Sequence, residues 1–547
     1  MNYQDLADLI FPNVKGANYY EEKYPERNLK EGAMVTRFAP SPTGFVHMGS
    51  LYTSFSNLIL ARQTGGVVYL RIEDTDQKRE VENGIEGIIR DFDNLKIYFD
   101  EGPTQGGAYG PYIQSERRDI YQSFAKKLLE EGKAYPCFAT EEELKNLREM
   151  QELNKERIGY YGSWAKYRNL PIEEAISKIK NGDPYIIRLK SPGDFNHKII
   201  LDDCIKGKIE MPENDMDIVI IKSDGLPTYH FAHAVDDHLM HTTHVIRGDE
   251  WVSSYPVHKQ LFEVLGFVEP RYAHIAPFTI KEGNTIRKLS KRKDKEAAIS
   301  FYNQMGVPDE VIKLYIATVN NSSFEEWYIA NPDKTIEDYQ FTFDKMPIGG
   351  SLFDLEKLKS ISKVYFSKLT ASDIYNRTLE YSKQYDEEFY KLIKDNPDYL
   401  ISLLDIERNI ERPRMDIESY SDVRKEFWYM FDELFNQVHA PYESITYAYD
   451  VSFIKDYFEN IYNENDSEEE WFNKVKDFAS SIGFAVNRKE YKEDPSKFLG
   501  NIADFCSIIR VMLTTSNMSP NMYDLLKLYG KDRLLKRIEL FLNSINK

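Results

Sequence analysis

The strongest constraint on the fold is the order of the segments between residues 34 and 73. MVTRFAP (34–40) has the pattern of a short buried strand that ends at prolines. The turn residues SPTG come next, followed by a segment whose apolar residues have helical spacing until Gly65 and Gly66 end it. VVYLRIE (67–73) is a second predicted strand. This order predicts a βαβ unit, and therefore a parallel sheet with ligands at the carboxyl ends of its strands.

A similar pattern returns later in the chain. MDIVIIKSDG (216–225), HVIRGDE (244–250) and RYAHIA (271–276) are predicted strands, and SSYPVHKQLFEVLGF (253–267) is a predicted helix. The segment between the two halves, 113–216, begins with helix signals and ends in strand-like runs. We therefore expect a separate α+β domain inserted into a split nucleotide-binding sheet.

From about residue 364 onward almost every segment has the pattern of an amphipathic helix. The expected fold is thus α/β, with a split Rossmann-type parallel sheet, an inserted α+β domain and an all-α C-terminal region. The expected boundaries are an N-terminal extension (1–33), the first half of the sheet (34–112), the insertion (113–216), the second half (217–285), a loop and connecting region (286–363) and two helical subdomains (364–465 and 466–547).

Bulk composition limits the functional class. The 547 residues are too many for one hydrophobic core, and 42% hydrophobic with 29% charged residues is typical of a globular protein. No apolar run has the length of a membrane span, and MNYQDLADLIFPNVKG has no secretory pattern, so we expect a cytoplasmic protein without membrane contact. The net charge of −19 argues only weakly against nucleic acid, because binding needs a local basic face.

The three cysteines are Cys137, Cys204 and Cys506. They lie far apart and form no CxxC pair, so neither a local zinc site nor a disulfide framework is indicated. Reduced, partly buried thiols are the simplest interpretation.

The first candidate site is RFAPSPTG, which begins at Arg37 and ends at Gly44, followed by His47 and Gly49. Prolines and glycine set a tight turn at a strand end, where backbone N–H groups and a helix N-terminus can meet an anionic phosphate. Gly44 and Gly49 let a ligand approach the backbone closely, and His47 can donate to phosphate oxygens. A loop with an ordinary capping histidine is the alternative.

The second candidate is KLSKR, with Lys288, Ser290 and Lys291, after the strands of the second half. In adenylation a carboxylate attacks the α-phosphorus of ATP and pyrophosphate leaves, so cations must meet the charge that develops on the leaving group. Lysine supplies a compact positive charge. A solvated basic turn is the alternative.

Together the two motifs resemble the signature motifs of class I aminoacyl-tRNA synthetases, usually written HIGH and KMSKS. The wording APSPTG before the histidine is the form of the glutamyl branch. RIEDTD, GPYIQSERRDIY, DGLPTYHFAHAVDDHLM, THVIRGDEW and GGSLFDLEKL are also similar to blocks of glutamyl-tRNA synthetases. The similarity is close over roughly 34–360 and loose over 400–547.

The resemblance implies roles for individual residues. The catalytic residues would be His47, Lys288 and Lys291, and the ATP contacts Gly44, His47, Gly49, Lys288, Ser290 and Lys291. The glutamate contacts would be Arg37, Ser41, Glu73, Tyr229, His233 and Arg247. The arginines fit a desolvated carboxylate, which requires a charged partner, whereas neutral glutamine would leave a guanidinium underpaired. Two departures are that many members have asparagine in place of His233, and that Ser50 replaces the second histidine of the class signature.

The resemblance also implies partners. These are tRNA(Glu), glutamate and ATP with Mg²⁺, and a monomer is expected. The insertion should approach the acceptor end of tRNA, and ERPRMD places Arg414, then Arg412, as candidates for anticodon contact. Some members carry zinc in the insertion after an AYxC element, but AYPCFAT has Cys137 alone, so no zinc or other structural metal is expected. Members of this branch usually need bound tRNA before they form the adenylate, and we expect the same here.

Other functions share part of this pattern. A glutaminyl-tRNA synthetase would carry C-terminal β-barrels, which the helical pattern disfavours, and a glutamyl-queuosine tRNA synthetase would be shorter. An enzyme that charges both glutamate and glutamine tRNAs with glutamate stays open, because this depends on the tolerance for one anticodon base. A small-molecule adenylyltransferase would keep His47 and Lys291 but would not need residues 364–547. A non-catalytic tRNA-binding protein would not need His47, Lys288 and Lys291 to be intact.

Overall fold

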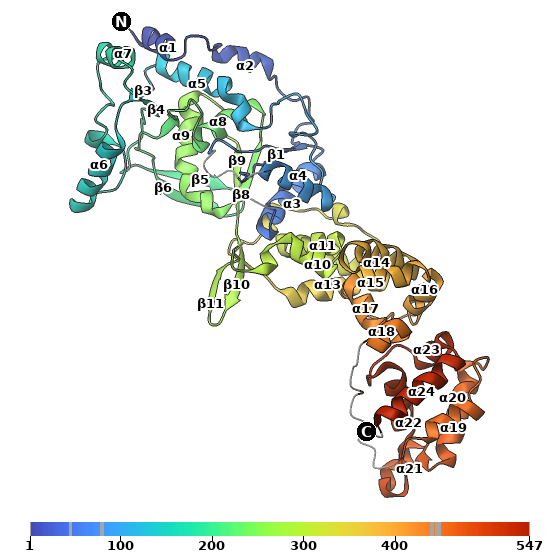
Figure 1. Cartoon of the computed structure of the whole chain (residues 1–547). Helices are drawn as coiled ribbons and strands as arrows, with labels where there is room; N and C mark the ends of the chain where they lie inside the picture. Colours follow the sequence, from blue (N-terminus) through green and yellow to red (C-terminus); the bar gives the residue numbers. More distant parts are fainter. Residues whose placement is uncertain are drawn as a thin grey trace. The chain divides into compact units, whose positions relative to one another are not determined.

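The computed structural model describes residues 2–42, 46–76, 81, 83–290, 292–437, 442 and 450–545 (Figure 1). The chain forms two compact units. The N-terminal unit consists of Met1–Phe301 and Lys313–Asp354, and the C-terminal unit of Tyr302–Ile312 and Leu355–Lys547. Among the described residues no helix has both the length and the apolar character needed to cross a bilayer.

In Figure 1 the helices of the N-terminal unit lie around its sheets, except at the hairpin labelled β10 (Phe278–Glu282) and β11 (Thr285–Lys288), which projects from the unit. They are α1 (Tyr3–Ile10), α2 (Ala17–Lys23), α3 (Met48–Gln63), α4 (Gly84–Asn94), α5 (Arg118–Glu130), α6 (Glu141–Leu153), α7 (Ile172–Lys180), α8 (Tyr229–Leu239), α9 (Tyr255–Leu265) and α12 (Phe324–Ala330), while α10 (Ile299–Met305) and α11 (Asp309–Asn320) cross the chain boundaries between the units.

The predicted βαβ unit is confirmed. β1 (Val35–Phe38) pairs in parallel with β2 (Val67–Leu70), and α3 connects them. Gly65 has a φ of +67°, which suits glycine after a helix end. A Cβ on Gly66 would lie 1.9 Å from the carbonyl oxygen of Met34, so only glycine allows the chain to enter β2 beside β1.

The second half of the parallel sheet is also present. β8 (His244–Gly248) pairs in parallel with β9 (Arg271–Ile275), and α9 connects them. The N–H of Thr243 donates to the carbonyl of Val35 at 3.0 Å, which joins the start of β8 to β1. The carboxyl ends of β1 and β8 therefore lie at one edge, where ligands of such sheets bind.

The insertion does not match its expected boundary. β3 (Ala134–Cys137), β4 (Ile186–Leu189) and β7 (Val219–Ile221) form an antiparallel sheet in the order β3-β4-β7. β5 (Lys198–Asp203) and β6 (Gly207–Pro212) instead extend the sheet of β8 and β9, in the order β6-β5-β9-β8. The placement of 216–225 in the parallel sheet, and of 198–212 in the insertion, was therefore wrong. Strand patterns predict strands, but partners are chosen by contacts between distant residues.

The N-terminal extension is partly helical, as predicted, and packs on the N-terminal unit. Asn2 and Asp5 form a capping box at the start of α1. Leu6 is buried on the inner face of α1, and the carboxylate of Asp8 lies 2.6 Å from Nζ of Lys126 on α5. The helix signals of the extension are local, whereas its docking on α5 is a tertiary result.

A hairpin of β10 (Phe278–Glu282) and β11 (Thr285–Lys288) precedes KLSKR, and β12 (Ser351–Leu352) pairs in parallel with β10. The basic loop therefore follows a hairpin, rather than directly following a strand of the parallel sheet.

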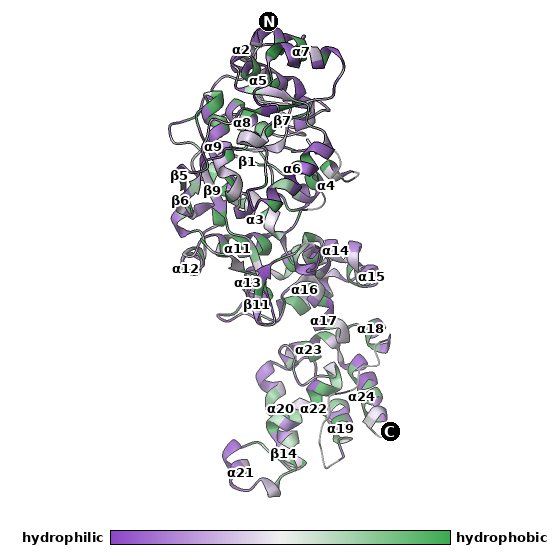
Figure 2. Cartoon of the chain, turned by 90° about the vertical axis from the view of Figure 1, so that its left-hand side faces the viewer, coloured by the Kyte–Doolittle hydropathy of each residue, from purple (hydrophilic) through white to green (hydrophobic). Residues whose placement is uncertain are grey.

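In the part of the C-terminal unit that the structure describes, the chain is helical apart from one short strand pair. Its elements are α13 (Leu355–Lys368), α14 (Ala371–Tyr385), α15 (Glu387–Lys394), α16 (Pro397–Asp405), α17 (Tyr420–Phe427), α18 (Asp432–Gln437), α19 (Phe453–Asn460), α20 (Glu468–Ser481), α21 (Arg488–Glu493), α22 (Ile502–Thr514), α23 (Met522–Tyr529) and α24 (Lys531–Ile545), with β13 (Phe484–Ala485) and β14 (Gly500–Asn501). These helices carry both hydrophilic and hydrophobic residues, as amphipathic helices do (Figure 2).

Between α17 and α18 the chain does not continue as α-helix, and a 3₁₀ turn at Trp428–Met430 separates them. The carbonyl of Tyr429 accepts hydrogen bonds from Arg537, and the carbonyl of Met430 accepts from Arg533. Side chains thus satisfy carbonyl groups that a continuous helix would bond internally.

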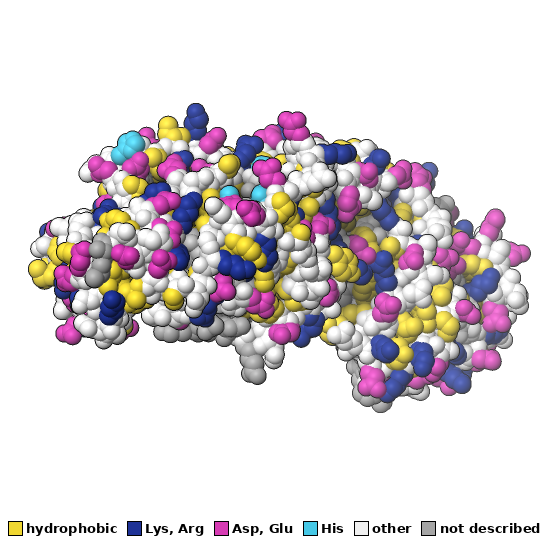
Figure 3. Space-filling view, turned by 90° about the horizontal axis from the view of Figure 1, so that it is seen from above, with side chains coloured by type: hydrophobic (Ala, Val, Ile, Leu, Met, Phe, Trp, Pro, Cys, Tyr) yellow, Lys and Arg dark blue, Asp and Glu magenta, His cyan; other side chains and the backbone are white. Residues whose placement is uncertain are grey.

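Acidic and basic side chains are interspersed on the face seen in Figure 3. Although the chain as a whole has a net charge of −19, its acidic side chains do not gather into one patch on that face.

Candidate functional site

A cleft of about 520 Å³ lies in the N-terminal unit, at the carboxyl ends of β1 and β8. Most of the predicted site residues line it, namely Arg37, Ser41, His47, Gly49, Glu73, Tyr229, Arg247 and Lys288. The predicted ATP contacts Gly44 and Lys291 lie outside the described residues. Two motifs that are about 240 residues apart in the chain therefore contribute to one cavity, as ligand sites of split parallel sheets do.

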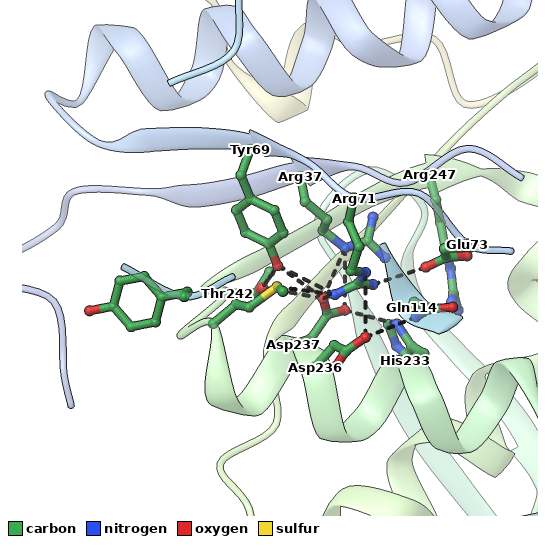
Figure 4. Close-up of polar contacts among 12 residues, drawn as sticks. Arg37, Tyr69, Arg71, Glu73, Gln114, His233, Asp236, Asp237, Thr242 and Arg247 are labelled. Carbon is green, nitrogen blue, oxygen red and sulfur yellow. Dashed lines mark hydrogen bonds and ion pairs between the residues drawn. The ribbon is translucent and has the colours of Figure 1, made fainter. Parts of the chain in front are cut away.

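Buried charges support the wall formed by β1 and β2 (Figure 4). The carboxylate of Asp237 on α8 accepts a hydrogen bond from Nε of Arg37 at 3.2 Å and from a terminal guanidinium nitrogen of Arg71 at 2.7 Å. Arg71 also donates to the carboxylate of Glu73 at 3.0 Å. Because an unpaired buried charge is costly, these contacts hold the side chains in place.

The protonation states follow from burial and pairing. Burial alone would raise the pKa of Asp237, but Arg37 and Arg71 hold that pKa well below its ordinary value. Burial raises the pKa of Glu73, while Arg71 and Arg37 oppose the rise. Glu73 therefore lies at the cleft with the guanidinium of Arg71 bonded behind it, and that cation favours the charged form of the carboxyl against the effect of burial.

A deeper layer completes the network. Asp236 accepts hydrogen bonds from Arg117 at 2.7 Å, Gln114 at 2.9 Å and Tyr121 at 2.7 Å. Arg37, Glu73 and His233 of this network were predicted as site residues from the sequence, whereas Arg71, Asp236 and Asp237 were not. The signal was present, because AVDDHLM places two adjacent acids on a helix most of whose residues are buried, and buried acids require partners.

His233 does not line the cleft, contrary to its predicted role as a glutamate contact. It is fully buried, with Nδ1 2.8 Å from the carboxylate of Asp237 and Nε2 2.9 Å from the hydroxyl of Tyr272. Burial lowers the pKa of His233 to about 3, so its imidazole is neutral. Its ring lies behind Tyr229, which forms the cleft surface at this point.

Arg247 is held without a carboxylate. Its side chain is buried with 5% exposure, and its Nε donates to Nε2 of His274 at 3.0 Å. A terminal nitrogen donates to Nδ1 of His258 at 3.1 Å, and weaker contacts reach the hydroxyl of Tyr229 and the carbonyl of Trp251, both at 3.4 Å. Within the described part of the chain, none of the hydrogen bonds of Arg247 is to an acidic side chain.

His47 is the N-cap of α3, and its Nδ1 accepts a hydrogen bond from the N–H of Ser50 at 3.2 Å. A Cβ on Gly49 would lie 3.0 Å from the imidazole, so the glycine leaves room for the ring over the first turn. Gly49, Ser50 and Thr53 line the cleft beside it. The first turn of α3 therefore borders the cavity, where a helix N-terminus attracts negative charge.

The KLSKR loop reaches the same cleft through Lys288, whose Nζ lies 3.3 Å from the carboxylate of Glu250. Ser290 does not line the cavity, and its N–H donates to Asp294 at 2.7 Å. Arg287 also donates to Asp294, and these bonds lower the pKa of Asp294 to about 2. Asp294 thus connects the loop to the hairpin through Ser290 and Arg287. His47 and Lys288, one from each motif, line the same cavity.

The two anticodon candidates differ in their surroundings. The side chain of Arg414 is 10% exposed, contacts the carboxylate of Asp416 at 2.8 Å and lies over the ring of Phe427. Arg412 is exposed. Arg414 is already occupied inside the C-terminal unit, so the geometry favours Arg412 as a contact for an external partner.

No cluster of three or more His, Cys, Asp or Glu side chains able to hold a metal occurs among the described residues. Cys137 is buried, and its thiol donates to the hydroxyl of Tyr160 at 3.5 Å. The absence of zinc stays a prediction.

Comparison with known proteins agrees with this geometry. The model for "tRNA synthetases class I (E and Q), catalytic domain" matches residues 33–359. The glutamate–tRNA ligase of Clostridium perfringens (strain 13 / Type A) is 46% identical, over 98% of this chain and 100% of the relative. That of Clostridium beijerinckii is also 46% identical, over 99% and 100%. The crystal structure of a glutamate tRNA ligase from Elizabethkingia meningosepticum in complex with its amino acid aligns with a TM-score of 0.74 and 27% identity, covering 93% of this chain and 99% of that one. The chain belongs to the glutamate–tRNA ligases, a family of class I aminoacyl-tRNA synthetases.

Proposed function

We propose that the protein activates glutamate with ATP and transfers the glutamyl group to the 3′ end of tRNA(Glu). The observation that carries this proposal is the buried guanidinium of Arg247, which faces the cleft and makes no hydrogen bond to an acidic side chain of the described chain. Such a group stabilises a bound carboxylate strongly, since both charges are desolvated and arginine can donate two parallel bonds.

Glutamate recognition is assigned to the wall formed by β1, β2, α8 and β8. Arg37 and Arg247 would bind the two carboxylates of glutamate, and Glu73 would accept hydrogen bonds from its ammonium group. Ser41 and Tyr229 complete the lining. Glutamine has a neutral amide in place of one carboxylate, so it would leave a buried guanidinium underpaired and bind less tightly.

ATP is assigned to the side formed by α3 and the basic loop. The N-terminus of α3, with His47 and Gly49, would hold the phosphates together with the neighbouring Gly44. A carboxylate oxygen of glutamate attacks the α-phosphorus, the bond to the bridging oxygen of the β-phosphate breaks, and pyrophosphate leaves. Lys288 and Lys291, with Ser290 beside them, would balance the charge that develops on the leaving pyrophosphate.

Mg²⁺ does not fit as an ion held by the protein alone, because the described residues hold no cluster of metal ligands. We assign it to the phosphates of ATP, where it commonly keeps several water ligands.

The RNA is assigned to the rest of the molecule. The insertion would approach the acceptor end, and the helices from residue 364 onward would bind the anticodon, with Arg412 ahead of Arg414. In the transfer step the terminal ribose hydroxyl attacks the carbonyl of the adenylate, and AMP leaves. Use of tRNA(Gln) as a second acceptor depends on one anticodon base and is part of the test.

The test is a charging assay with purified tRNA(Glu) and tRNA(Gln), each with glutamate and with glutamine. We expect glutamate to be attached to tRNA(Glu), and pyrophosphate exchange with and without tRNA measures whether adenylate formation needs it. Arg37→Ala should abolish most glutamate use. Normal charging by that variant would show that the substrate assignment is wrong.

Lys291→Ala should lower aminoacylation by about two orders of magnitude, the scale of losing one transition-state charge contact, with little change in the KM for glutamate. Lys293→Ala is the matched control, since it removes an exposed lysine from the same loop. A rate for Lys291→Ala within about twofold of this control would remove Lys291 from the mechanism.

A further inference from the structure

We infer that His258 and His274 are positioning residues that orient Arg247 through neutral hydrogen bonds and so leave its positive charge available to the substrate. The inference rests on the proposed function, because it concerns how the glutamate site is built. Neither His258 nor His274 was predicted from the sequence motifs, and each is assigned one neutral tautomer.

His274 is placed by the sheet. Arg247 on β8 and His274 on β9 are register partners in parallel strands, so both side chains lie on one face of the sheet. A guanidinium has only donors, so Nε2 of His274 must accept from Nε of Arg247 at 3.0 Å. The proton of the neutral ring is then on Nδ1, which donates to the carboxylate of Asp203 at 2.6 Å. Asp203, at the end of β5, also accepts from the backbone N–H of His274, which fixes the carboxylate.

His258 is placed by α9. It is fully buried, and its Nδ1 must accept from Arg247 at 3.1 Å for the same reason. Its proton is therefore on Nε2, which donates to Nδ1 of His230 at 2.9 Å. The ring of His233 packs against that of His258, with centroids 4.3 Å apart. Both hydrogen bonds of His258 require the same tautomer of its ring, with the proton on Nε2. Arg247 therefore donates to His258, and His258 donates to His230.

Both rings remain neutral. Burial and the neighbouring cations and rings hold the pKa of His258 well below its ordinary value. Burial also lowers the pKa of His274, although Asp203 opposes the change. Protonation of either ring would remove an acceptor and place a second cation beside Arg247.

Arg37 and Arg247 differ in the charge of the groups that orient them. Arg37 is oriented by the carboxylate of Asp237, which balances part of its charge. Arg247 is oriented by two imidazole nitrogens, which fix its geometry without balancing its charge. Compared with Arg37, Arg247 therefore gains more from a bound carboxylate.

The test uses the full-length enzyme in aminoacylation at saturating tRNA(Glu), with kcat and the KM values for glutamate and ATP measured separately. His258→Leu should raise the KM for glutamate about tenfold or more, the scale of one hydrogen bond to a charged group. The KM for ATP and kcat should stay within about twofold, because the histidine does not touch the ATP side. His258→Asn should restore most of the glutamate KM, since the amide oxygen can take the place of Nδ1 as a neutral acceptor.

His244→Leu is the control. His244 is also buried and lies at the start of β8, but it bonds to Thr243 and stacks on Phe343 rather than contacting Arg247. Its removal tests the loss of a buried histidine as such. His274→Met and His274→Gln form an independent pair should His258→Leu fail to fold, because glutamine can place an oxygen near the position of Nε2.

The outcomes separate the two proposals. If the wild-type enzyme does not attach glutamate to tRNA, the proposed function fails. If it does, but His258→Leu and His274→Met have the same glutamate KM as His244→Leu, the positioning role is wrong. Equal increases in the KM for glutamate and in the KM for ATP would also overturn the positioning role, because they would indicate a general structural effect.

Discussion

Replacement of Asp237 by asparagine tests the buried charge network directly. Three buried arginines and three buried carboxylates form the connected network behind the cleft, so the formal charge within that network sums to zero. These are Arg37, Arg71 and Arg117 against Glu73, Asp236 and Asp237. Asp237→Asn keeps the size of the side chain but leaves three positive charges against two negative ones.

The expected cost follows from that imbalance. Asp237 is fully buried and bonds to Arg71 at 2.7 Å and to Arg37 at 3.2 Å, so its removal leaves two guanidinium groups short of a partner. Breaking a buried pair in this way destabilises a protein by about 3–5 kcal/mol. The pKa of Asp237 is held well below its ordinary value of 3.8. Its contribution is therefore fully present above pH 3.8 and is lost as the pH falls toward the folded pKa.

Urea unfolding, with hydrogen exchange as its readout, is the suitable assay. Peptides that cover β1 and β8 report on the N-terminal unit, so the C-terminal unit does not obscure its transition. Glu210→Gln is the control, because it removes one charge from an exposed pair with Lys198 in the same unit. If Asp237→Asn and Glu210→Gln had the same unfolding midpoint at neutral pH, the reasoning about buried charge would be refuted.

Other perturbations test further parts of the structure. Gly49→Ala would put a Cβ 3.0 Å from the imidazole of His47, so we expect a higher KM for ATP in aminoacylation, and an unchanged value would contradict the close packing. Arg412→Ala should weaken binding in a titration with labelled tRNA and leave the urea midpoint unchanged, whereas Arg414→Ala should lower the midpoint, because it loses Asp416 and the ring of Phe427. The reverse result would restore Arg414 as the anticodon candidate. Burial raises the pKa of Glu426 to about 7, so the stability that this carboxyl supplies is present at low pH and lost as the pH rises through 7. Glu426→Gln should therefore raise the urea midpoint of the C-terminal unit at about pH 8 more than at about pH 5, and equal shifts would argue against a raised pKa.

The family and the main elements were readable from the sequence because their signals are local. The strand MVTRFAP, the helix after His47 and the strand HVIRGDE depend on the spacing of apolar residues and on turn residues within a few positions. The helical character of the C-terminal region has the same origin. Motifs with fixed spacing, such as KLSKR, were equally visible.

Strand partners and the support of the site were decided only in three dimensions. β7 pairs with β4 and β5 joins β9, although their sequence patterns are equally compatible with other partners. Arg37 and Asp237 are 200 residues apart in the chain, and Arg71 and Asp237 are 166 residues apart. Periodicity predicts that an element forms and which of its faces is buried. The choice of partner depends on which distant charge or lone pair meets that face, because a buried ionic group is stable only where another part of the chain completes its bonding.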